Sequence, residues 1–215
     1  MSRILIFANG ELPDLERAGA LVRADDYIIC ADGGTQHALA LGLRPHLVIG
    51  DMDSLTQEAW EQLEEEQIPI DLHPRDKNET DLELALNAAL GRQPSSILIV
   101  AALGRRLDQT LGNISLLSDA RLAALDIRLD DGVEEVFLCR AQVEIAGDKG
   151  DILSLIPWNS PAHDIRTNGL KWPLNDETLY PEKTRGISNE MLGGHATVRL
   201  ASGLLLIVHR RRSAT

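Results

Sequence analysis

The segment LVIGDMDS, residues 47–54, begins with a short apolar run and ends in two aspartates. Residues 47–50 predict a buried strand, and Gly50 allows the backbone to turn where that strand ends. Asp51 and Asp53 then project beyond the carboxyl end of the strand. In an open parallel sheet, this edge is where ligands bind. The segment therefore predicts a parallel α/β sheet with an acidic site at its edge.

Similar apolar runs alternate with helical patterns up to about residue 125. The predicted strands are residues 4–8, 27–31, 47–50, 70–73 and 97–101. Between the last two, apolar residues at positions 82, 85, 86, 89 and 90 have the spacing of an amphipathic helix. A repeated strand–helix–strand order predicts a parallel sheet covered by helices on both faces. Residues 1–125 are therefore predicted to form a Rossmann-like α/β domain.

The remaining residues, 126–215, lose the helical periodicity and contain short strand-like segments. These are residues 136–139, 142–145, 152–156, 196–200 and 204–209. The last two flank residues 201–203, a three-residue loop with a glycine where a bulged hairpin has one. Short strands with frequent turn residues predict a small all-β domain, either a sandwich or a barrel.

Composition excludes several classes of protein. The formal net charge of −12 argues against nucleic acid or an anionic membrane as a partner, because both require a basic surface. No stretch approaches 18 apolar residues, and the apolar run at the amino terminus is too short for a signal peptide. Cys30 and Cys139 lie far apart, which fits neither a disulfide framework nor a thiolate metal site. We expect a cytoplasmic protein that binds neither nucleic acid nor membrane.

Further aspartates follow other predicted strands. Asp32 lies in CADGG, Asp76 and Asp81 lie in DKNETD, and Asp108 lies in GRRLDQT. Two carboxylates about 5 Å apart at an effective dielectric near 20 repel by roughly 3 kcal/mol, so their convergence requires a cation. Mg²⁺ typically binds one or two carboxylates together with substrate phosphates. The pattern predicts a metal-dependent enzyme that transfers or hydrolyses phosphoryl groups.

Simpler roles exist for several of these residues. Asp53 or Ser54 could cap the following helix, because residues 54–57 fit a capping box. Residues 80–83 fit a second capping box, and Lys77 either binds phosphate or is solvated. Arg106 is favoured for phosphate because its planar fork of donors matches phosphate oxygens, with Asp108 orienting it or assisting the metal. A P-loop is excluded, since GxxxxGK[ST] does not occur.

Taken together, ADGG, GDMDS, ETD and GRRLD occur in an order that resembles the thiamine pyrophosphokinase (thiamine diphosphokinase) family. The second half extends the resemblance, because TNGLKWPL at residues 167–174 and RGISNE at residues 185–190 are similar to that family's GLKWPL and SNE segments. The resemblance implies a homodimer that pairs an α/β nucleotide-binding domain with a β-sandwich. It also implies transfer of the diphosphate of ATP to the hydroxyethyl group of thiamine, which yields thiamine diphosphate and AMP.

The resemblance further implies roles for individual residues. The catalytic residues would be Asp32, Asp51, Asp53 and Asp81, and Asp51, Asp53 and Asp81 would bind Mg²⁺. Gly33, Thr80, Arg106 and Asp108 would bind ATP. Ser188 and Asn189 would bind thiamine in a site completed across the dimer. Many relatives read GGRLDH and KDKTD, from which this chain departs at Asn78, Glu79, Arg105 and Gln109, so these four residues are assigned no role.

Two other functions remain open from the residues. One is a carboxylate- and Mg²⁺-dependent phosphatase, although such enzymes place the acidic pair after the first strand rather than the third. The other is a non-catalytic nucleotide or thiamine sensor on the same scaffold, although the full set of acidic residues favours catalysis.

Overall fold

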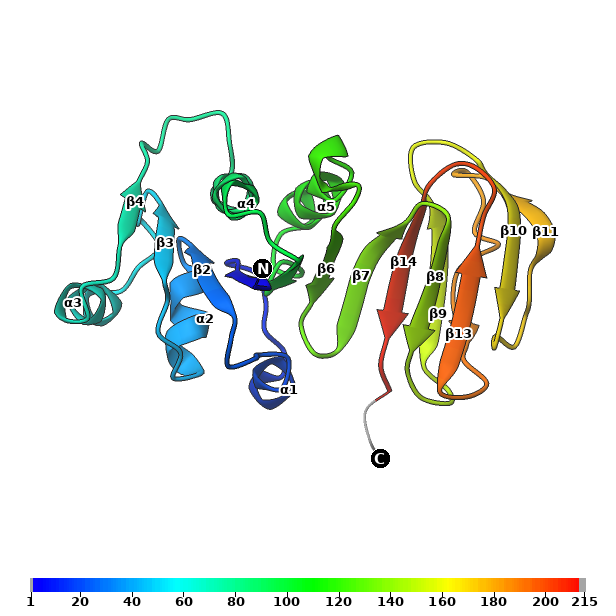
Figure 1. Cartoon of the computed structure of the whole chain (residues 1–215), viewed down its shortest axis with the longest axis horizontal. Coiled ribbons are helices and arrows are strands. Elements are labelled where there is room, and N and C mark those ends of the chain that lie inside the picture. Colours follow the sequence, from blue (N-terminus) through cyan, green and yellow to red (C-terminus); the bar gives the residue numbers. More distant parts are fainter. Residues whose placement is uncertain (1, 213–215) are drawn as a thin grey trace. The chain divides into compact units, whose positions relative to one another are not determined.

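The computed structural model describes residues 2–212, which form two compact units that divide between Gly132 and Val133. The first unit is an α/β structure and the second is entirely β, so the predicted fold class is confirmed (Figure 1). Across residues 2–212, no helix has both the length and the apolar content that a bilayer-crossing segment needs.

The first unit contains a parallel sheet. Its strands are β1 Ile4–Phe7, β2 Tyr27–Ala31, β3 Leu47–Gly50, β4 Ile70–Leu72, β5 Ser96–Val100 and β6 Asp126–Asp130. They lie in the order β6-β5-β1-β2-β3-β4, and every adjacent pair is parallel. The chain therefore proceeds outward from β1 to β4 and returns at β5 on the other side of β1. This reversal creates a topological switch point between β1 and β5, where ligands bind in such sheets.

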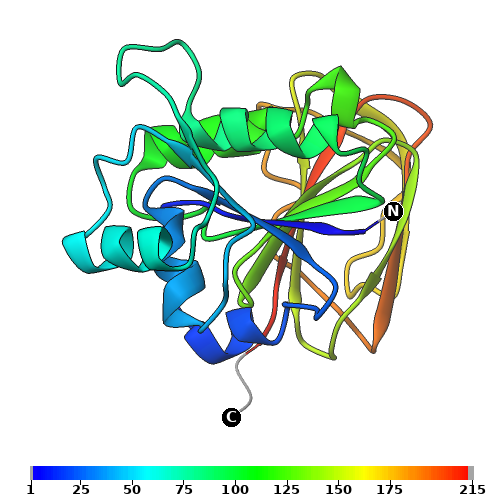
Figure 2. The same cartoon turned by 60° about the vertical axis from the view of Figure 1, so that its left-hand side comes forward.

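Helices cover both faces of this sheet. They are α1 Leu15–Gly19, α2 Gly34–Ala40, α3 Gln57–Glu65, α4 Asp81–Gly91 and α5 Leu107–Leu116, followed by a 3-10 turn at Ala120–Leu122. Figures 1 and 2 show α4 and α5 on one face and α1, α2 and α3 on the other. Leu5 and Phe7 of β1 join a core cluster with Ala18, Ala38 and Leu63 of α1, α2 and α3. Side chains alternate along a strand, so the intervening positions of β1 are buried against the opposite face.

The five strands predicted in this unit are confirmed, with ends that differ by at most one residue. The sixth strand, β6, is absent from the sequence prediction and lies after residue 125, where the domain boundary is predicted. Its sequence, DIRLD, has three charged residues among five, so its apolar signal is weak. Ile127 and Leu129 are nevertheless buried beside β5, which keeps this segment within the first unit.

The second unit is a β-sandwich. Its strands are β7 Glu134–Cys139, β8 Gln142–Ala146, β9 Ile152–Pro157, β10 Ala162–Asn168, β11 Asn175–Leu179, β12 Asn189–Glu190, β13 His195–Arg199 and β14 Leu205–Arg210. They form two antiparallel layers, in the orders β12-β9-β14-β7 and β11-β10-β13-β8. Leu155 and Ile207 of the first layer share one core with Ile165 and Val198 of the second.

The predicted hairpin across residues 201–203 is wrong. β13 pairs with β8 and β10, whereas β14 pairs with β7 and β9, so the two strands belong to different layers. Ser202 forms a bridge with His163 of β10, and Gly203 has a φ of +93°. A Cβ at Gly203 would lie 2.5 Å from the carbonyl oxygen of Pro161. The glycine thus allows the chain to cross closely from one layer to the other, a role that local sequence does not distinguish from a hairpin bulge.

Candidate functional site

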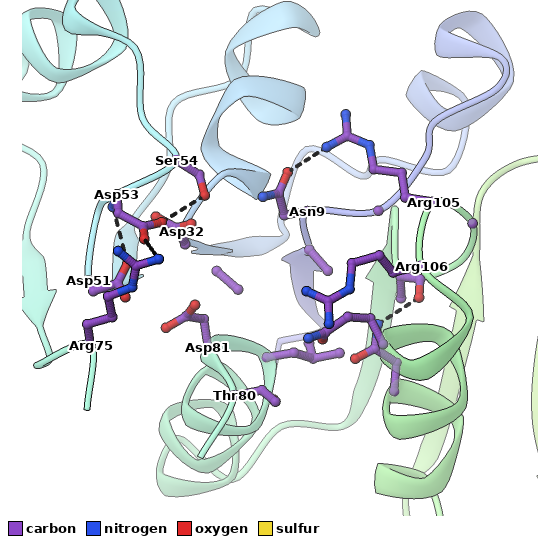
Figure 3. Close-up of a pocket in the computed structure, with 18 residues that line it drawn as sticks. Asn9, Asp32, Asp51, Asp53, Ser54, Arg75, Thr80, Asp81, Arg105 and Arg106 are labelled. Atoms are coloured by element: carbon purple, nitrogen blue, oxygen red, sulfur yellow. Dashed lines mark hydrogen bonds and ion pairs between the residues drawn. The ribbon is translucent and has the colours of Figure 1, made fainter. Parts of the chain in front are cut away.

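A cavity of about 550 Å³ opens at the carboxyl edge of the parallel sheet. Loops after β1, β2, β3, β4 and β5 line it, together with the first turn of α4 and one side of α5. The lining residues are 8–10, 31–32, 51, 53–54, 75, 80–82, 102, 104–106, 109 and 113. Figure 3 shows the carboxylates of Asp32, Asp51 and Asp53 on one side of the cavity and the guanidinium groups of Arg105 and Arg106 on the other. The cavity therefore presents anionic groups opposite cationic ones.

Three carboxylates converge on the acidic side. One oxygen from each of Asp32, Asp51 and Asp53 lies within 4.8 Å of the other two. Asp32 is buried, its φ is +45°, and among the described residues its Oδ1 has no hydrogen-bond partner. Buried polar atoms in native structures normally have partners, so this oxygen requires an explanation. A hard divalent cation would supply the missing partner, because such ions bind carboxylate oxygens.

The turn after β3 directs both of its aspartates toward this group. The Asp51 Oδ1 atom accepts a hydrogen bond from the Asp53 backbone N–H at 3.1 Å, and Met52 between them has a φ of +63°. Capping by Asp53 or Ser54 is wrong, because the cap of α3 is Thr56, whose Oγ1 accepts from the N–H of Ala59 at 3.2 Å. The two carboxylates are therefore not used to begin the helix.

Asp81 lies beside the acidic group without belonging to the set of three. The predicted cap at the start of α4 is confirmed, because Thr80 Oγ1 accepts from the N–H of Glu83 at 3.2 Å. Asp81 is the first residue of α4, and its Oδ1 forms an ion pair with Lys77 Nζ at 3.0 Å. Burial raises the pKa of Asp81, and the neighbouring Asp32 and Asp51 charges raise it further, whereas Lys77 opposes the shift.

Gly50 allows the carboxylates to approach one another. Its φ is +149°, and a Cβ at this position would lie 2.9 Å from the Cβ of Asp32 and 3.1 Å from Oδ1 of Asp81. Any side chain here would separate the aspartate that follows β2 from the aspartate that begins α4. This close approach explains why the acidic motif contains glycine directly after the strand.

The loop before α4 places two positively charged side chains, Lys77 and Arg75, beside the acidic group. The solvated reading of Lys77 is wrong, because its side chain is only 11% exposed and its ammonium nitrogen lies 3.8 Å from Asp51 Oδ2. Arg75 differs: its side chain is 84% exposed, and it lies 3.4 Å from Asp53 Oδ2. Asp76, between them in sequence, is exposed and does not line the cavity.

Arg106 lines the opposite side of the cavity. Its guanidinium donates to both carboxylate oxygens of Asp108, at 3.1 and 2.5 Å. The hydrogen bond from Arg106 lowers the pKa of Asp108. Asp108 itself does not line the cavity, so it orients the arginine rather than joining the acidic group. Gly33 is also outside the lining: it precedes α2, and a Cβ there would lie 2.5 Å from the side-chain amide of Asn9.

Several lining residues are absent from the sequence prediction. Arg105 and Gln109 depart from the family pattern and are assigned no role, yet both line the cavity. Arg105 has a φ of +56° and its guanidinium donates to Asn9 Oδ1 at 3.3 Å. Asn113 of α5 also lines the cavity and donates to the carbonyl of Ala102 at 2.7 Å. Asn9 has a recognisable signal, since a polar residue and a glycine follow the first buried strand, as they do elsewhere in this site.

Ser188 and Asn189 lie in the second unit, where Asn189 is hydrogen-bonded to Trp172 of the GLKW segment and Ser188 to Ser154 of β9. Asn189 Oδ1 accepts from the backbone N–H groups of Trp172 and Glu190 at 3.1 and 2.9 Å, and its Nδ2 donates to the Trp172 carbonyl at 2.7 Å. The Asn189 amide is therefore occupied by backbone groups. Trp172 remains 49% exposed. Ser188 has a φ of +58°, and its N–H donates to Ser154 Oγ at 3.0 Å.

Comparison with known proteins gives consistent matches over almost the whole chain. Residues 18–137 match the family "Thiamin pyrophosphokinase, catalytic domain", and residues 140–205 match "Thiamin pyrophosphokinase, vitamin B1 binding domain". The thiamine pyrophosphokinase of Bacillus subtilis (strain 168) is 32% identical over 182 residues, which are 84% of this chain and 85% of that protein. Thiamine pyrophosphokinase 1 of Oryza sativa subsp. japonica is 27% identical, over 83% of this chain and 76% of that protein.

Solved structures with the same fold cover the chain from end to end. The crystal structure of thiamine pyrophosphokinase from Bacillus subtilis has a TM-score of 0.89 at 29% identity, with coverage of 99% of this chain and 100% of that one. The thiamin pyrophosphokinase from Geobacillus thermodenitrificans has a TM-score of 0.83 at 25% identity, with 99% of each chain covered.

Proposed function

The chain belongs to the thiamin pyrophosphokinase family, and on this premise we propose that it transfers the diphosphate of ATP to the hydroxyethyl group of thiamine. The products are thiamine diphosphate and AMP. The enzyme is thus a transferase of thiamine diphosphate biosynthesis. One observation carries the chemical part of the proposal: carboxylates from two strand ends meet within 4.8 Å, opposite arginines, at the ligand-binding edge of a parallel sheet.

The acidic group fits a Mg²⁺ ion. Its donors are carboxylate oxygens, and the buried Oδ1 of Asp32 has no hydrogen-bond partner among the described residues. Asp32, Asp51 and Asp53 would hold the ion, with Asp81 beside them. When bound, such an ion would offset the negative charge of the nucleotide's phosphates.

The residues of the chain then position the reactants. Arg106, held by Asp108, directs its guanidinium into the cavity and binds phosphate oxygens, and Arg105 supports it from the same loop. Thr80 fixes the start of α4, which sets the position of Asp81. The thiamine hydroxyl attacks the β-phosphorus, AMP departs, and a carboxylate of this cavity, Asp32 or Asp81, accepts the hydroxyl proton. Gly33 contributes by allowing the Asn9 side chain close to α2.

Thiamine recognition is proposed for the cluster around Ser188 and Asn189. Asn189 fixes the backbone of Trp172, whose ring is half-exposed. The Lys171 ammonium lies over this ring, 4.9 Å from its centroid, so the ring already attracts a cation. Aromatic rings attract cations positioned over their faces, and thiamine carries a cationic thiazolium ring. Asn189 therefore acts through Trp172 rather than through its own amide.

We also propose a homodimer with a site completed across the interface. Helix α5 has no buried residue, and its Leu107 and Leu111 are 73% and 49% exposed. The same helix contributes Gln109 and Asn113 to the cavity. A second copy covering α5 would remove this apolar surface from water and close the cavity. Cys30 and Cys139 are buried free thiols, which suits the reducing environment of the cytoplasm that we propose for this protein.

The test is to incubate the protein with ATP, Mg²⁺ and thiamine, and to identify the nucleotide product. Diphosphate transfer forms AMP and thiamine diphosphate in equal amounts. A phosphatase would release inorganic phosphate without requiring thiamine, and a sensor would form no AMP. The family matches favour diphosphate transfer over both alternatives. Formation of ADP or free phosphate in place of AMP would contradict the proposal.

A further inference from the structure

Lys77 lies in an unusual place for a lysine, because its charged end points into the acidic group rather than into solvent. Its Nζ lies 3.0 Å from Asp81 Oδ1 and 3.8 Å from Asp51 Oδ2, and it donates to the Pro74 carbonyl at 3.3 Å. Of these three oxygens, the Pro74 carbonyl accepts a hydrogen bond, and the two carboxylates form ion pairs with the ammonium group. With a side chain 11% exposed, Lys77 is fixed rather than loosely solvated.

We propose that Lys77 is a resident counter-ion that competes with the divalent cation for the acidic group, so that the site admits the cation with its nucleotide in preference to the free ion. The proposal rests on the proposed function, since it assumes that a nucleotide-bound cation is the natural ligand. Lys77 would then be a positioning residue, which sets the affinity of the acidic group for the divalent cation.

The charges of the site support this role. Asp32, Asp51, Asp53 and Asp81 supply four negative charges within one cavity wall, and the loop before α4 returns two positive charges through Arg75 and Lys77. The two cations do not have equal weight. The Arg75 side chain is 84% exposed, so solvent screens its charge more than that of Lys77, whose side chain is 11% exposed.

The position of Lys77 makes its effect depend on the form of the incoming cation. A free divalent ion bound by Asp51 would lie a few ångströms from the ammonium group and would be repelled by it. A cation that arrives on a triphosphate brings negative charge that offsets this repulsion. Removing the charge of Lys77 should therefore change the two affinities in opposite directions: the free ion should bind more tightly, and the nucleotide complex should lose an attraction.

The experiment compares Lys77→Met and Lys77→Gln with wild type in the absence of nucleotide and thiamine. Free Mn²⁺ is titrated and followed by its paramagnetic resonance signal. We expect both variants to bind Mn²⁺ at least about tenfold more tightly, because an adjacent, partly shielded positive charge has been removed. Lys77→Arg should remain near wild type. Arg75→Met is the matched control, with the same charge lost from the same loop, and should change Mn²⁺ affinity by less than about threefold because the group is exposed.

A second measurement titrates Mg²⁺ together with the α,β-methylene analogue of ATP, in which the bond to be broken is replaced. Lys77→Met and Lys77→Gln should bind this complex more weakly than wild type. Circular dichroism confirms folding of each variant, and the glutamine variant retains hydrogen-bonding capacity if methionine is not tolerated.

The outcomes separate this inference from the proposed function. If wild type forms AMP but neither neutral variant gains Mn²⁺ affinity, or both lose it, the counter-ion role is overturned while the function stands. If wild type forms no AMP, the function is overturned, whereas a gain in Mn²⁺ affinity would still support the role of Lys77.

Discussion

Asn189 binds both backbone polar groups of Trp172, donating to its carbonyl at 2.7 Å and accepting from its N–H at 3.1 Å. The pairing resembles one rung of an antiparallel ladder in which a side-chain amide replaces a second strand. It adds to the bonds that Leu170 and Lys171 make with Met191 and Glu190, and it fixes the backbone of an exposed aromatic residue.

Substitution of Asn189 by Asp should therefore impair thiamine binding. An aspartate keeps the acceptor but faces the Trp172 carbonyl with a second acceptor, and loss of a partly buried hydrogen bond typically costs about 1–3 kcal/mol. We expect the KM for thiamine to rise about tenfold or more while the KM for ATP stays unchanged. Steady-state kinetics with each substrate varied in turn provide the test. Asn168→Asp, on an exposed amide that bonds Thr197 in the same unit, is the control. Equal changes in the KM for thiamine and the KM for ATP would contradict the proposed role of Asn189.

The acidic group should be required for turnover rather than for folding. Asp51→Asn and Asp53→Asn each remove a charge from the proposed cation site, and we expect kcat to fall by about 10²–10³, as for other groups that stabilise developing charge. Stability should be unchanged or increased, because a repulsion between carboxylates is relieved. AMP formation at saturating Mg²⁺ and urea unfolding provide the two measurements. Asp76→Asn, an exposed acid outside the cavity, should retain wild-type rates. Near-normal rates in both cavity variants would contradict the assignment of Asp51 and Asp53 as ligands of the cation.

Gly50 should tolerate no side chain. In Gly50→Ala the new Cβ would lie 2.9 Å from the Cβ of Asp32, at a φ of +149°. We expect a loss of about 1–3 kcal/mol in the free energy of unfolding, together with lower activity, because the carboxylates are forced apart. Gly91→Ala at the end of α4 has no atom within 4 Å of its added Cβ and should be neutral or slightly stabilising. The prediction is wrong if both variants unfold at the same denaturant concentration.

His209 should make the stability of the second unit pH-dependent. Its side chain is 0% exposed, with Nε2 2.9 Å from Asp151 Oδ2 and Nδ1 3.4 Å from Glu135 Oε2. Burial alone would lower the pKa of His209, but hydrogen bonds to the two carboxylates outweigh it, so the pKa is raised above 6.5. Arg211, which also faces Glu135, opposes this shift.

Because the pKa of His209 is higher in the folded chain, the stabilisation is fully present below pH 6.5 and is lost as the pH rises through the folded value. His209→Gln should thus be least stable relative to wild type at pH 6, by about 3 kcal/mol, and the difference should shrink towards pH 9. Urea unfolding at several pH values measures this directly. A difference that grows with pH would show that the imidazole is neutral in the folded protein.

The exposed leucines of α5 should hold the proposed dimer together. Leu107→Asp places a charge on a surface that a second copy would bury, so we expect monomers by sedimentation velocity and reduced turnover. Leu72→Asp is the control, because that leucine is 66% exposed on β4 and does not belong to α5. A dimer that persists in the Leu107 variant would show that the interface does not involve α5.

The parts of the fold that depend on local pattern were accessible from sequence. The five strands of the prediction and the cap at Thr80 need only short-range periodicity and turn chemistry. β6 was not accessible, because its charged positions conceal a strand that forms only against β5. The crossing at Gly203 was not accessible either, since a glycine suits both a bulge and a close passage between layers.

The site residues, too, could be predicted from local sequence only in part. Asp51 and Asp53 are recognisable because a glycine and two acids follow a strand, and Asp32 has a similar setting. Which oxygens converge is a tertiary property, and it places Asp32 rather than Asp81 in the group of three. Lys77 was ambiguous because a lysine in a polar loop is normally solvated, and only the packing of its loop against β3 and α4 buries it.

The position of β5 next to β1 has a consequence for synthesis of the chain. Asn9 and Arg105, which are hydrogen-bonded in the cavity wall, are separated by 96 positions, and one edge of β1 is paired by β5 alone. While the ribosome is still producing the first 95 residues, that edge remains open, and the part of the cavity wall that contains Arg105 and Arg106 has not been made. The acidic group is thus made before the arginines that face it, and the nascent sheet must avoid unwanted strand pairing at the open edge of β1 until β5 is made.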